Sequence, residues 1–271
     1  MSKLTKCAII SRIKCEKCEA FFAPTAICAD EGGMDLRMLR LMQTNNEIND
    51  YYDKTAHDYD HSRFGNSYGE FIDYQEKTIV AKLLKDIPNS QTLDMACGTG
   101  RFLDFADFGI DASEKMLEIA RQKFPQLSLY HGDATKTHFN SSTFSAIISF
   151  HFLMHLDKNT AKEVINECNR ILNKNGILII DFPSKYRKQL LGKKTEGWRC
   201  ANDYKLNELL ALNQNFKLKK YYGIMFLPIH RFSSKVRKMV IKIDSFLCRS
   251  FLRRYASFLI VVLEKAGVNN A

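Results

Sequence analysis

The stretch that decides the fold runs from residue 93 to residue 101 and reads Leu93-Asp94-Met95-Ala96-Cys97-Gly98-Thr99-Gly100-Arg101. A short apolar strand ends in an acid, and two glycines follow in the turn. Glycine adopts backbone conformations that are closed to other residues and lets the main chain approach a ligand closely. The stretch lacks the third glycine of a dinucleotide fingerprint and the Gly-Lys-Ser/Thr of a phosphate-binding loop. By itself it indicates a ligand-binding turn in an α/β protein.

On both sides of this turn, apolar strands alternate with amphipathic helices. We expect strands at 92–95, 107–111, 127–131, 144–150, 177–182, 216–226 and 257–263. We expect helices at 46–60, 68–85, 113–123, 159–172, 204–212 and 233–252. This alternation is typical of a mainly parallel sheet with helices on both faces. Ligands bind such sheets beyond the carboxyl ends of the strands, so the residues there are the candidate site.

Acids also end the second and third expected strands. Asp111, in Gly109-Ile110-Asp111-Ala112-Ser113, is suited to accept hydrogen bonds from two ribose hydroxyls. Asp133, in His131-Gly132-Asp133-Ala134, is placed to accept one from an adenine amino group. The three acids together therefore predict a nucleoside-containing ligand.

In this order the motifs resemble the class I S-adenosylmethionine-dependent methyltransferases, in their broad small-molecule branch (methyltransferase domain types 11 and 25). The resemblance covers about residues 46–265. It implies a Rossmann-like, seven-stranded, mostly parallel sheet whose last strand is antiparallel, and S-adenosyl-L-methionine as cofactor. The cofactor-binding residues that it implies are Tyr59, Arg63, Asp94, Ala96, Gly98, Gly100, Asp111, Ala112, Met116, Asp133, Ala134 and Phe150. Among these, Tyr59 and Arg63 would cap the cofactor and Met116 would pack on the adenine.

The spacing after the glycine turn departs from the family pattern. Only ten residues separate Gly100 from Asp111, which is fewer than the family usually has. We therefore expect little more than a turn where the family has its first crossover helix.

Two histidines are candidate catalytic bases. Methyl transfer needs mainly alignment of the acceptor, together with removal of a proton where the acceptor's pKa is high. His151 and His155 follow the fourth strand, beside the expected acceptor position. The alternative for His155 is a role in packing and backbone hydrogen bonding only.

The net charge of +10 is unevenly distributed. Residues 1–180 hold 21 basic and 24 acidic side chains, whereas residues 181–271 hold 19 and 6. The basic third is either a surface for an anionic partner or a solvated face. A helix at 233–252 can align six apolar residues opposite its lysines and arginines: Val236, Met239, Val240, Ile243, Phe246 and Leu247. That helix either contacts a membrane or a lipid-like acceptor, or packs on the sheet with a basic outer face.

Residues 1–44 read as an extension, Cys-containing and poorly ordered, that precedes a methyltransferase domain at 45–271. Cys15 and Cys18 have a zinc-knuckle spacing that Cys7 and Cys28 could complete, but a second Cys-x-x-Cys is missing, so we expect no metal. Neither a secretory signal nor an apolar run long enough for a transmembrane helix is evident, and we expect a cytoplasmic protein.

The sequence favours transfer of a methyl group to an oxygen or carbon of a small-molecule or lipid-like, possibly anionic acceptor. No Asn/Asp-Pro-Pro-Tyr or Pro-Cys follows the fourth strand, which argues against chemistry on nucleic-acid bases. The alternatives are an RNA methyltransferase that uses the basic third and a non-catalytic scaffold that retains the cofactor fold. A nicotinamide-dependent reductase is disfavoured by the missing third glycine.

Overall fold

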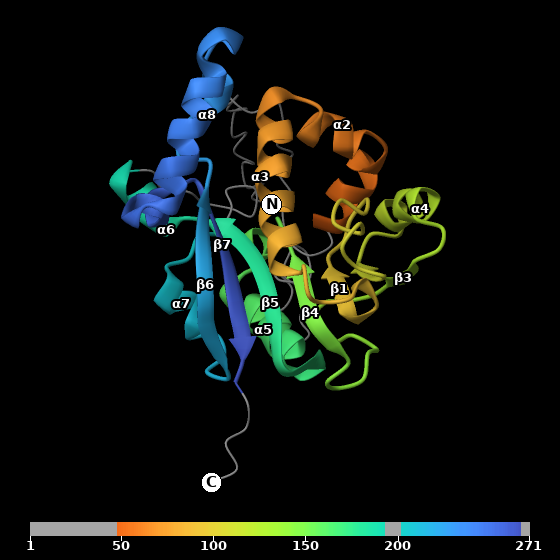
Figure 1. The fold of residues 1–271 in the computed structure, drawn as a ribbon. Coiled ribbons are helices and arrows are strands. Elements are labelled where there is room, and N and C mark those ends of the chain that lie inside the picture. Colours follow the sequence, from red (N-terminus) through yellow and green to blue (C-terminus); the bar gives the residue numbers. More distant parts are fainter. Residues whose placement is uncertain (1–47, 193–201, 267–271) are drawn as a thin grey trace, which may run out of the picture. The chain divides into compact units, whose positions relative to one another are not determined.

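A seven-stranded sheet forms the centre of the fold, in the order β3-β2-β1-β4-β5-β7-β6 (Figure 1). The computed structural model describes residues 48–192 and 202–266. The strands are β1 Thr92–Met95, β2 Phe108–Asp111, β3 Ser128–His131, β4 Phe144–Ser149, β5 Leu172–Pro183, β6 Phe216–Ile224 and β7 Phe258–Lys265. Strands β1 to β5 pair in parallel, and β7 is antiparallel to both β5 and β6. The predicted Rossmann-like sheet with an antiparallel last strand is confirmed.

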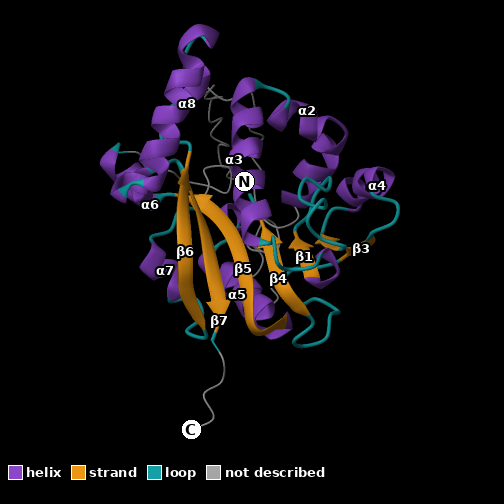
Figure 2. Ribbon diagram, viewed as in Figure 1, coloured by secondary structure: helices purple, strands orange, loops and turns teal. Residues whose placement is uncertain are grey.

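Helices cover both faces of this sheet (Figure 2). They are α2 Tyr59–Phe64, α3 Ser67–Leu83, α4 Glu114–Lys123, α5 Lys158–Ile171, α6 Lys185–Leu190, α7 Leu206–Leu210 and α8 Ser234–Arg249. Short 3-10 helices are η1 Ala56–Asp58, η2 Asn89–Gln91, η3 Leu153–His155, η5 Ile229–Arg231 and η6 Phe251–Tyr255. Because side chains alternate along a strand, Ile147 of β4 packs with α5 and α7 residues while Ile148 packs with Val80 of α3.

The order of the strands fixes where a ligand can bind. From β1 the chain moves outward to β2 and β3, and then returns to place β4 on the other side of β1. This reversal leaves a crevice beyond the carboxyl ends of β1 and β4, where doubly wound sheets bind their ligands. Asp94 lies in β1, and the residues that follow β4 begin with Phe150.

Three helices differ from the sequence expectation. The helix expected at 46–60 is helical over 48–55 and then breaks into η1 and α2. The helix expected at 233–252 ends at Arg249, because the Ser250 side chain accepts a bond from the Leu252 N–H and a new 3-10 turn starts there. Helix α6 was not expected, since its Lys-Tyr-Arg-Lys-Gln-Leu sequence has no apolar period. After Gly100 the chain forms turns only, as the short spacing predicted.

The expected N-terminal extension and its boundary near residue 44 lie outside the described residues, as do the candidate metal ligands Cys7, Cys15, Cys18 and Cys28. In the part of the chain that is described, no helix combines the length and the apolar character needed to cross a membrane.

Candidate active site

A cavity of about 660 Å³ lies beyond the carboxyl ends of β1, β2 and β4. Ten of the twelve expected cofactor residues line it, namely Tyr59, Asp94, Ala96, Gly98, Asp111, Ala112, Met116, Asp133, Ala134 and Phe150, and so do both candidate bases, His151 and His155. Arg63 and Gly100 are not part of its wall. The Arg63 guanidinium lies 6.0 Å from the Tyr59 ring centre, and Gly100 faces the side chains of Leu103 and Phe124.

Asp111, the last residue of β2, organises the glycine turn. One carboxylate oxygen accepts the Gly98 N–H at 2.7 Å, and the other accepts the Ser113 N–H at 2.8 Å. Desolvation raises the pKa of Asp111, although these backbone donors oppose the rise. A carboxylate can accept about four hydrogen bonds, so Asp111 retains capacity for further donors from the cavity.

Asp94 is the second acid of the cavity wall, and one of its carboxylate oxygens lacks a hydrogen-bond partner among the described residues. Its side chain is 2% exposed, and that oxygen is Oδ2. Burial raises the pKa of this carboxyl group to about 8. A buried polar atom without a partner costs free energy unless a ligand supplies the missing group. Asp94 therefore marks a position where a ligand donor fits.

The two glycines of the turn have different structural roles. Gly98 has φ +54°, and a Cβ built there would meet nothing within 4 Å, so its open side belongs to the cavity. Gly100 has φ +89°, and a Cβ there would lie 2.9 Å from Leu103 and 3.0 Å from Phe124. Gly98 thus leaves space for a ligand, whereas Gly100 leaves space for the protein's own packing.

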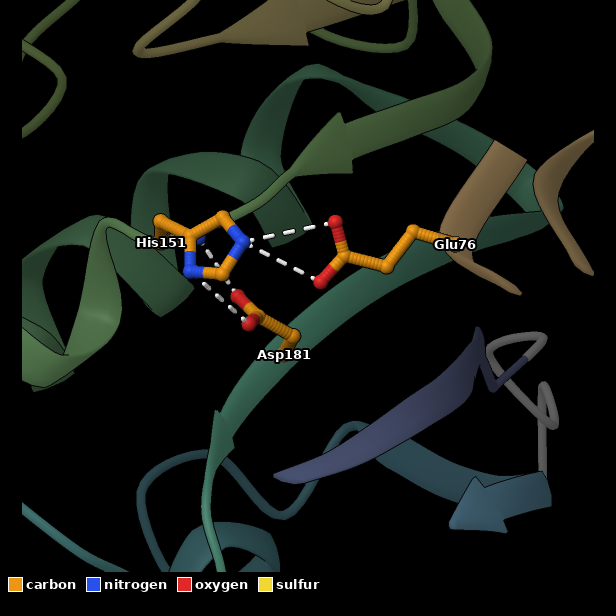
Figure 3. Close-up of side chains that lie close together, drawn as sticks. All are labelled: Glu76, His151 and Asp181. Atoms are coloured by element: carbon orange, nitrogen blue, oxygen red, sulfur yellow. Dashed lines mark hydrogen bonds and ion pairs between the residues drawn. The ribbon is translucent and has the colours of Figure 1, made fainter. Parts of the chain in front are cut away.

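A buried ion cluster forms one end of the cavity. Figure 3 shows the His151 ring between the carboxylates of Glu76, from α3, and Asp181, from β5. The His151 Nε2 atom lies 3.1 Å from Glu76 Oε1, and Nδ1 lies 3.6 Å from Asp181 Oδ2. The backbone N–H of His151 also donates to Asp181 Oδ1 at 2.6 Å. Arg101, which follows the glycine turn, lies 2.6 Å from Glu76 Oε2. The cluster joins the glycine turn, α3, β4 and β5.

The charges of this cluster stabilise one another. Burial alone would lower the pKa of His151, but the Glu76 and Asp181 carboxylates outweigh it and raise that pKa. Burial alone would raise the pKa of Glu76, but Arg101 and His151 hold it below its usual value. Glu76, His151 and Asp181 offer atoms within 4.8 Å of one another, a spacing that suits a metal ion. Because Arg101 already supplies the positive charge at Glu76, we describe an ion cluster and not a metal centre.

The segment 48–64 covers the cavity and is attached at three points. The Tyr52 hydroxyl lies 3.0 Å from His155 Nε2, and the Ser113 hydroxyl donates to Asp53 at 2.5 Å. The Thr99 hydroxyl donates to Asp60 at 2.6 Å. Because Thr99 belongs to the glycine turn, the cover and the turn hold each other in place.

Several residues at this site were not identified from the sequence. Tyr52 and Thr99 lie in stretches that the sequence points to, although neither was selected. Glu76 could have been identified from the sequence, because it lies four residues from both Ile72 and Val80 and therefore on the apolar face of its helix. Asp181 lies inside an apolar strand, where a charged residue needs a partner.

Comparisons with known proteins agree with this geometry. The sequence profile of a methyltransferase domain matches residues 93–180. An uncharacterized protein of Methanocaldococcus jannaschii is 26% identical over 238 residues, which are 80% of this chain and 90% of that protein. A demethylmenaquinone methyltransferase of Thermotoga maritima is 32% identical over 138 residues, which are 48% and 58% of the two chains. The structure of magnesium protoporphyrin IX methyltransferase from Synechocystis PCC 6803 has a TM-score of 0.56 at 17% identity, over 82% of this chain and 97% of that one.

Residues 93–180 thus match a methyltransferase domain, and the seven-stranded sheet has the fold of S-adenosylmethionine-dependent methyltransferases. This chain is accordingly an enzyme of the transferase class, and its cofactor is S-adenosyl-L-methionine.

Proposed function

We propose that this enzyme transfers a methyl group to an oxygen or carbon of a small, lipid-like acceptor. The observation that best supports this proposal is that one cavity holds two acids able to accept further hydrogen bonds, together with a histidine that can take a proton. S-adenosylmethionine, when bound, supplies an electrophilic methyl group on a cationic sulfur.

Asp94 and Asp111 are the residues that we assign to the cofactor's polar groups. The unpartnered Oδ2 of Asp94 suits a cationic ammonium group, such as that of the methionine portion. The remaining capacity of Asp111 suits the ribose hydroxyls. Met116 is buried against the same cavity and offers an apolar surface to the adenine, while Tyr59 covers the site from α2.

Of the two histidines, we assign the role of base to His155 and a positioning role to His151. Both ring nitrogens of His151 face carboxylates, which raise its pKa and engage the ring on both sides. His155 Nε2 faces the Tyr52 hydroxyl, and burial raises the pKa of Tyr52. Tyr52 therefore keeps its hydroxyl proton and can donate it to His155 Nε2. As the acceptor atom gains the methyl group, it passes its proton to the Tyr52 oxygen while Tyr52 gives its own proton to His155 Nε2.

The walls of the cavity favour an apolar acceptor. Tyr52, Tyr59, Phe150 and Phe152 contribute aromatic rings to it. Two of the relatives act, by their names, on demethylmenaquinone and on magnesium protoporphyrin IX. We expect this chemistry in the cytosol, where the free thiols of Cys97, Cys168 and Cys248 stay reduced.

The test is an acceptor screen in which methylated products are detected by mass spectrometry. For the best acceptor, we expect His155→Ala to lower kcat by roughly 10²-fold or more, because general-base catalysis contributes about that much. The Kd of S-adenosylmethionine should change only a few-fold. His57→Ala serves as the control, because His57 is exposed and lies outside the cavity wall.

Two results would oppose the proposal. Full activity in His155→Ala would show that His155 is not the base. Tight cofactor binding without turnover of any phenol, quinol or carboxylic acid would favour the scaffold alternative.

A further inference from the structure

Helix α8 carries an exposed apolar stripe. The side chains of Val236, Met239, Ile243 and Phe246 are 41%, 59%, 44% and 71% exposed. At about 100° per residue these positions fall within an arc of roughly 80°, so they form one continuous line along the helix. Large apolar side chains gathered in this way indicate an interaction surface.

The stripe is distinct from the face by which α8 packs on the protein. That face consists of Val240, Asp244 and Cys248, all buried at helical spacing. The Asp244 carboxylate accepts bonds from Gln75 Nε2 at 3.1 Å and from the Leu227 N–H at 2.7 Å. The helix is therefore held on α3 by one face. Of the six apolar residues that the sequence aligned, four form the exposed stripe, Val240 lies on the packed face, and Leu247 is half-buried.

Basic side chains border the stripe on the side away from the packed face. Lys235, Lys238, Lys242 and Arg249 are exposed, and the single acid of the helix is the buried Asp244. Residues 227–257 contain eight lysines and arginines and one acid. The outer surface of α8 thus presents apolar and basic side chains with no acid among them.

Further exposed apolar side chains lie on the elements next to the C-terminal end of α8. Phe251, at the start of η6, is 83% exposed, and Leu190 and Leu191, at the end of α6, are 70% and 53% exposed. Figure 1 shows α6 beside the C-terminal end of α8, and η6 contacts both helices. Figure 1 also shows α8 at the same end of the sheet as α2, which covers the cavity.

We propose that α8 docks on the surface of an anionic phospholipid bilayer. The apolar stripe would enter the boundary between headgroups and acyl chains, and the lysines would lie against the lipid phosphates. An RNA would engage the lysines but leave the apolar stripe in water. A second copy of the chain would bring two basic surfaces together, which repel each other. A bilayer with anionic headgroups offers an apolar environment to the stripe and negative charge to the lysines.

The test is flotation of the full chain with vesicles of phosphatidylcholine alone, or of equal parts phosphatidylcholine and phosphatidylglycerol. We expect binding to the anionic vesicles only. The double variants Met239→Ser/Phe246→Ser and Lys238→Gln/Lys242→Gln should each lower the partition coefficient by roughly tenfold or more. All four residues are exposed, so the fold should persist, which circular dichroism can verify.

Matched controls change exposed residues on other elements. Tyr74→Ser on α3 removes an aromatic side chain that is 67% exposed. Lys115→Gln/Lys162→Gln removes two exposed charges from α4 and α5. Neither control should change the binding to vesicles.

Three outcomes would overturn the proposal: no flotation of the wild type with anionic vesicles, flotation that both α8 variants retain, or a dimer in sedimentation that Met239→Ser/Phe246→Ser converts to a monomer. The assay needs neither methyl donor nor acceptor. Its failure is therefore separate from a failure of the proposed methyl transfer.

Discussion

At the scale of single residues, Glu76 is the buried acid that contacts both Arg101 and His151. It is fully buried and lies within 3.1 Å of both a guanidinium and an imidazole nitrogen. Glu76→Gln would leave the charges of Arg101 and His151 without their shared partner. Because breaking a buried ion pair leaves uncompensated charge, we expect a loss of about 3–5 kcal/mol in the free energy of unfolding.

Urea denaturation measures this loss. Glu70→Gln is the control, because Glu70 is an exposed acid on the same helix and should change stability by less than about 0.5 kcal/mol. Equal effects of the two substitutions would show that the ion cluster contributes nothing to stability.

Asp94 predicts a dependence of stability on pH. Its pKa is raised to about 8 in the folded protein, above the unfolded value of 3.8. The unfolded chain therefore releases this proton first, and the Asp94 contribution to stability falls as pH rises from about 4 to about 8. Asn stays neutral throughout, so Asp94→Asn should stabilise the ligand-free protein by an amount that grows over this range, with a ceiling of roughly 6 kcal/mol.

Thermal unfolding at about pH 5 and pH 8 tests this prediction. The same variant should bind S-adenosylmethionine more weakly, because it lacks the carboxylate that faces the cavity. A difference between wild type and variant that does not change with pH would contradict the burial argument.

At the scale of elements, the glycine turn should respond differently at its two glycines. Gly98→Ala adds a methyl group that meets no protein atom, so its cost is the left-handed backbone alone, about 1–2 kcal/mol. Its methyl group intrudes on the cavity, however, and should weaken cofactor binding at least tenfold. Gly100→Ala collides with Leu103 and Phe124 and should cost roughly 2–4 kcal/mol.

Urea unfolding and calorimetric titration separate these two effects. We expect Gly100→Ala to lower the free energy of unfolding more than Gly98→Ala does. We expect Gly98→Ala to weaken cofactor binding more than Gly100→Ala does. The reverse order would mean that the turn is oriented differently.

At the scale of the whole molecule, the order of strands and helices could be predicted because it depends on local patterns. The apolar run at 92–95, bounded by the acid and the glycines, gave β1 with its observed bounds. Strand β5 begins five residues earlier than expected, since Leu172 pairs with Phe144 ahead of the apolar run. Helix α6 has no apolar period, so hydrophobic patterning could not identify it.

The strand-end acids could also be anticipated, because parallel strands bring their carboxyl ends to one edge. The ion cluster could not. Glu76 and His151 are 75 positions apart, and His151 and Asp181 are 30 apart. Their proximity depends on how α3 packs on the sheet. The sequence also could not show which apolar residues of α8 are buried and which are exposed, because periodicity only groups them on one side of the helix.

The most direct test of the central claim is calorimetric titration of S-adenosylmethionine into the wild type and into Asp111→Asn, with Asp104→Asn as the exposed matched control. Asn keeps an acceptor for one backbone N–H but loses the charge that we assign to the ribose hydroxyls. We expect binding to the wild type and to the control, and binding at least tenfold weaker to Asp111→Asn with an unchanged fold. Equal affinity in all three proteins, or no binding to the wild type, would contradict the account.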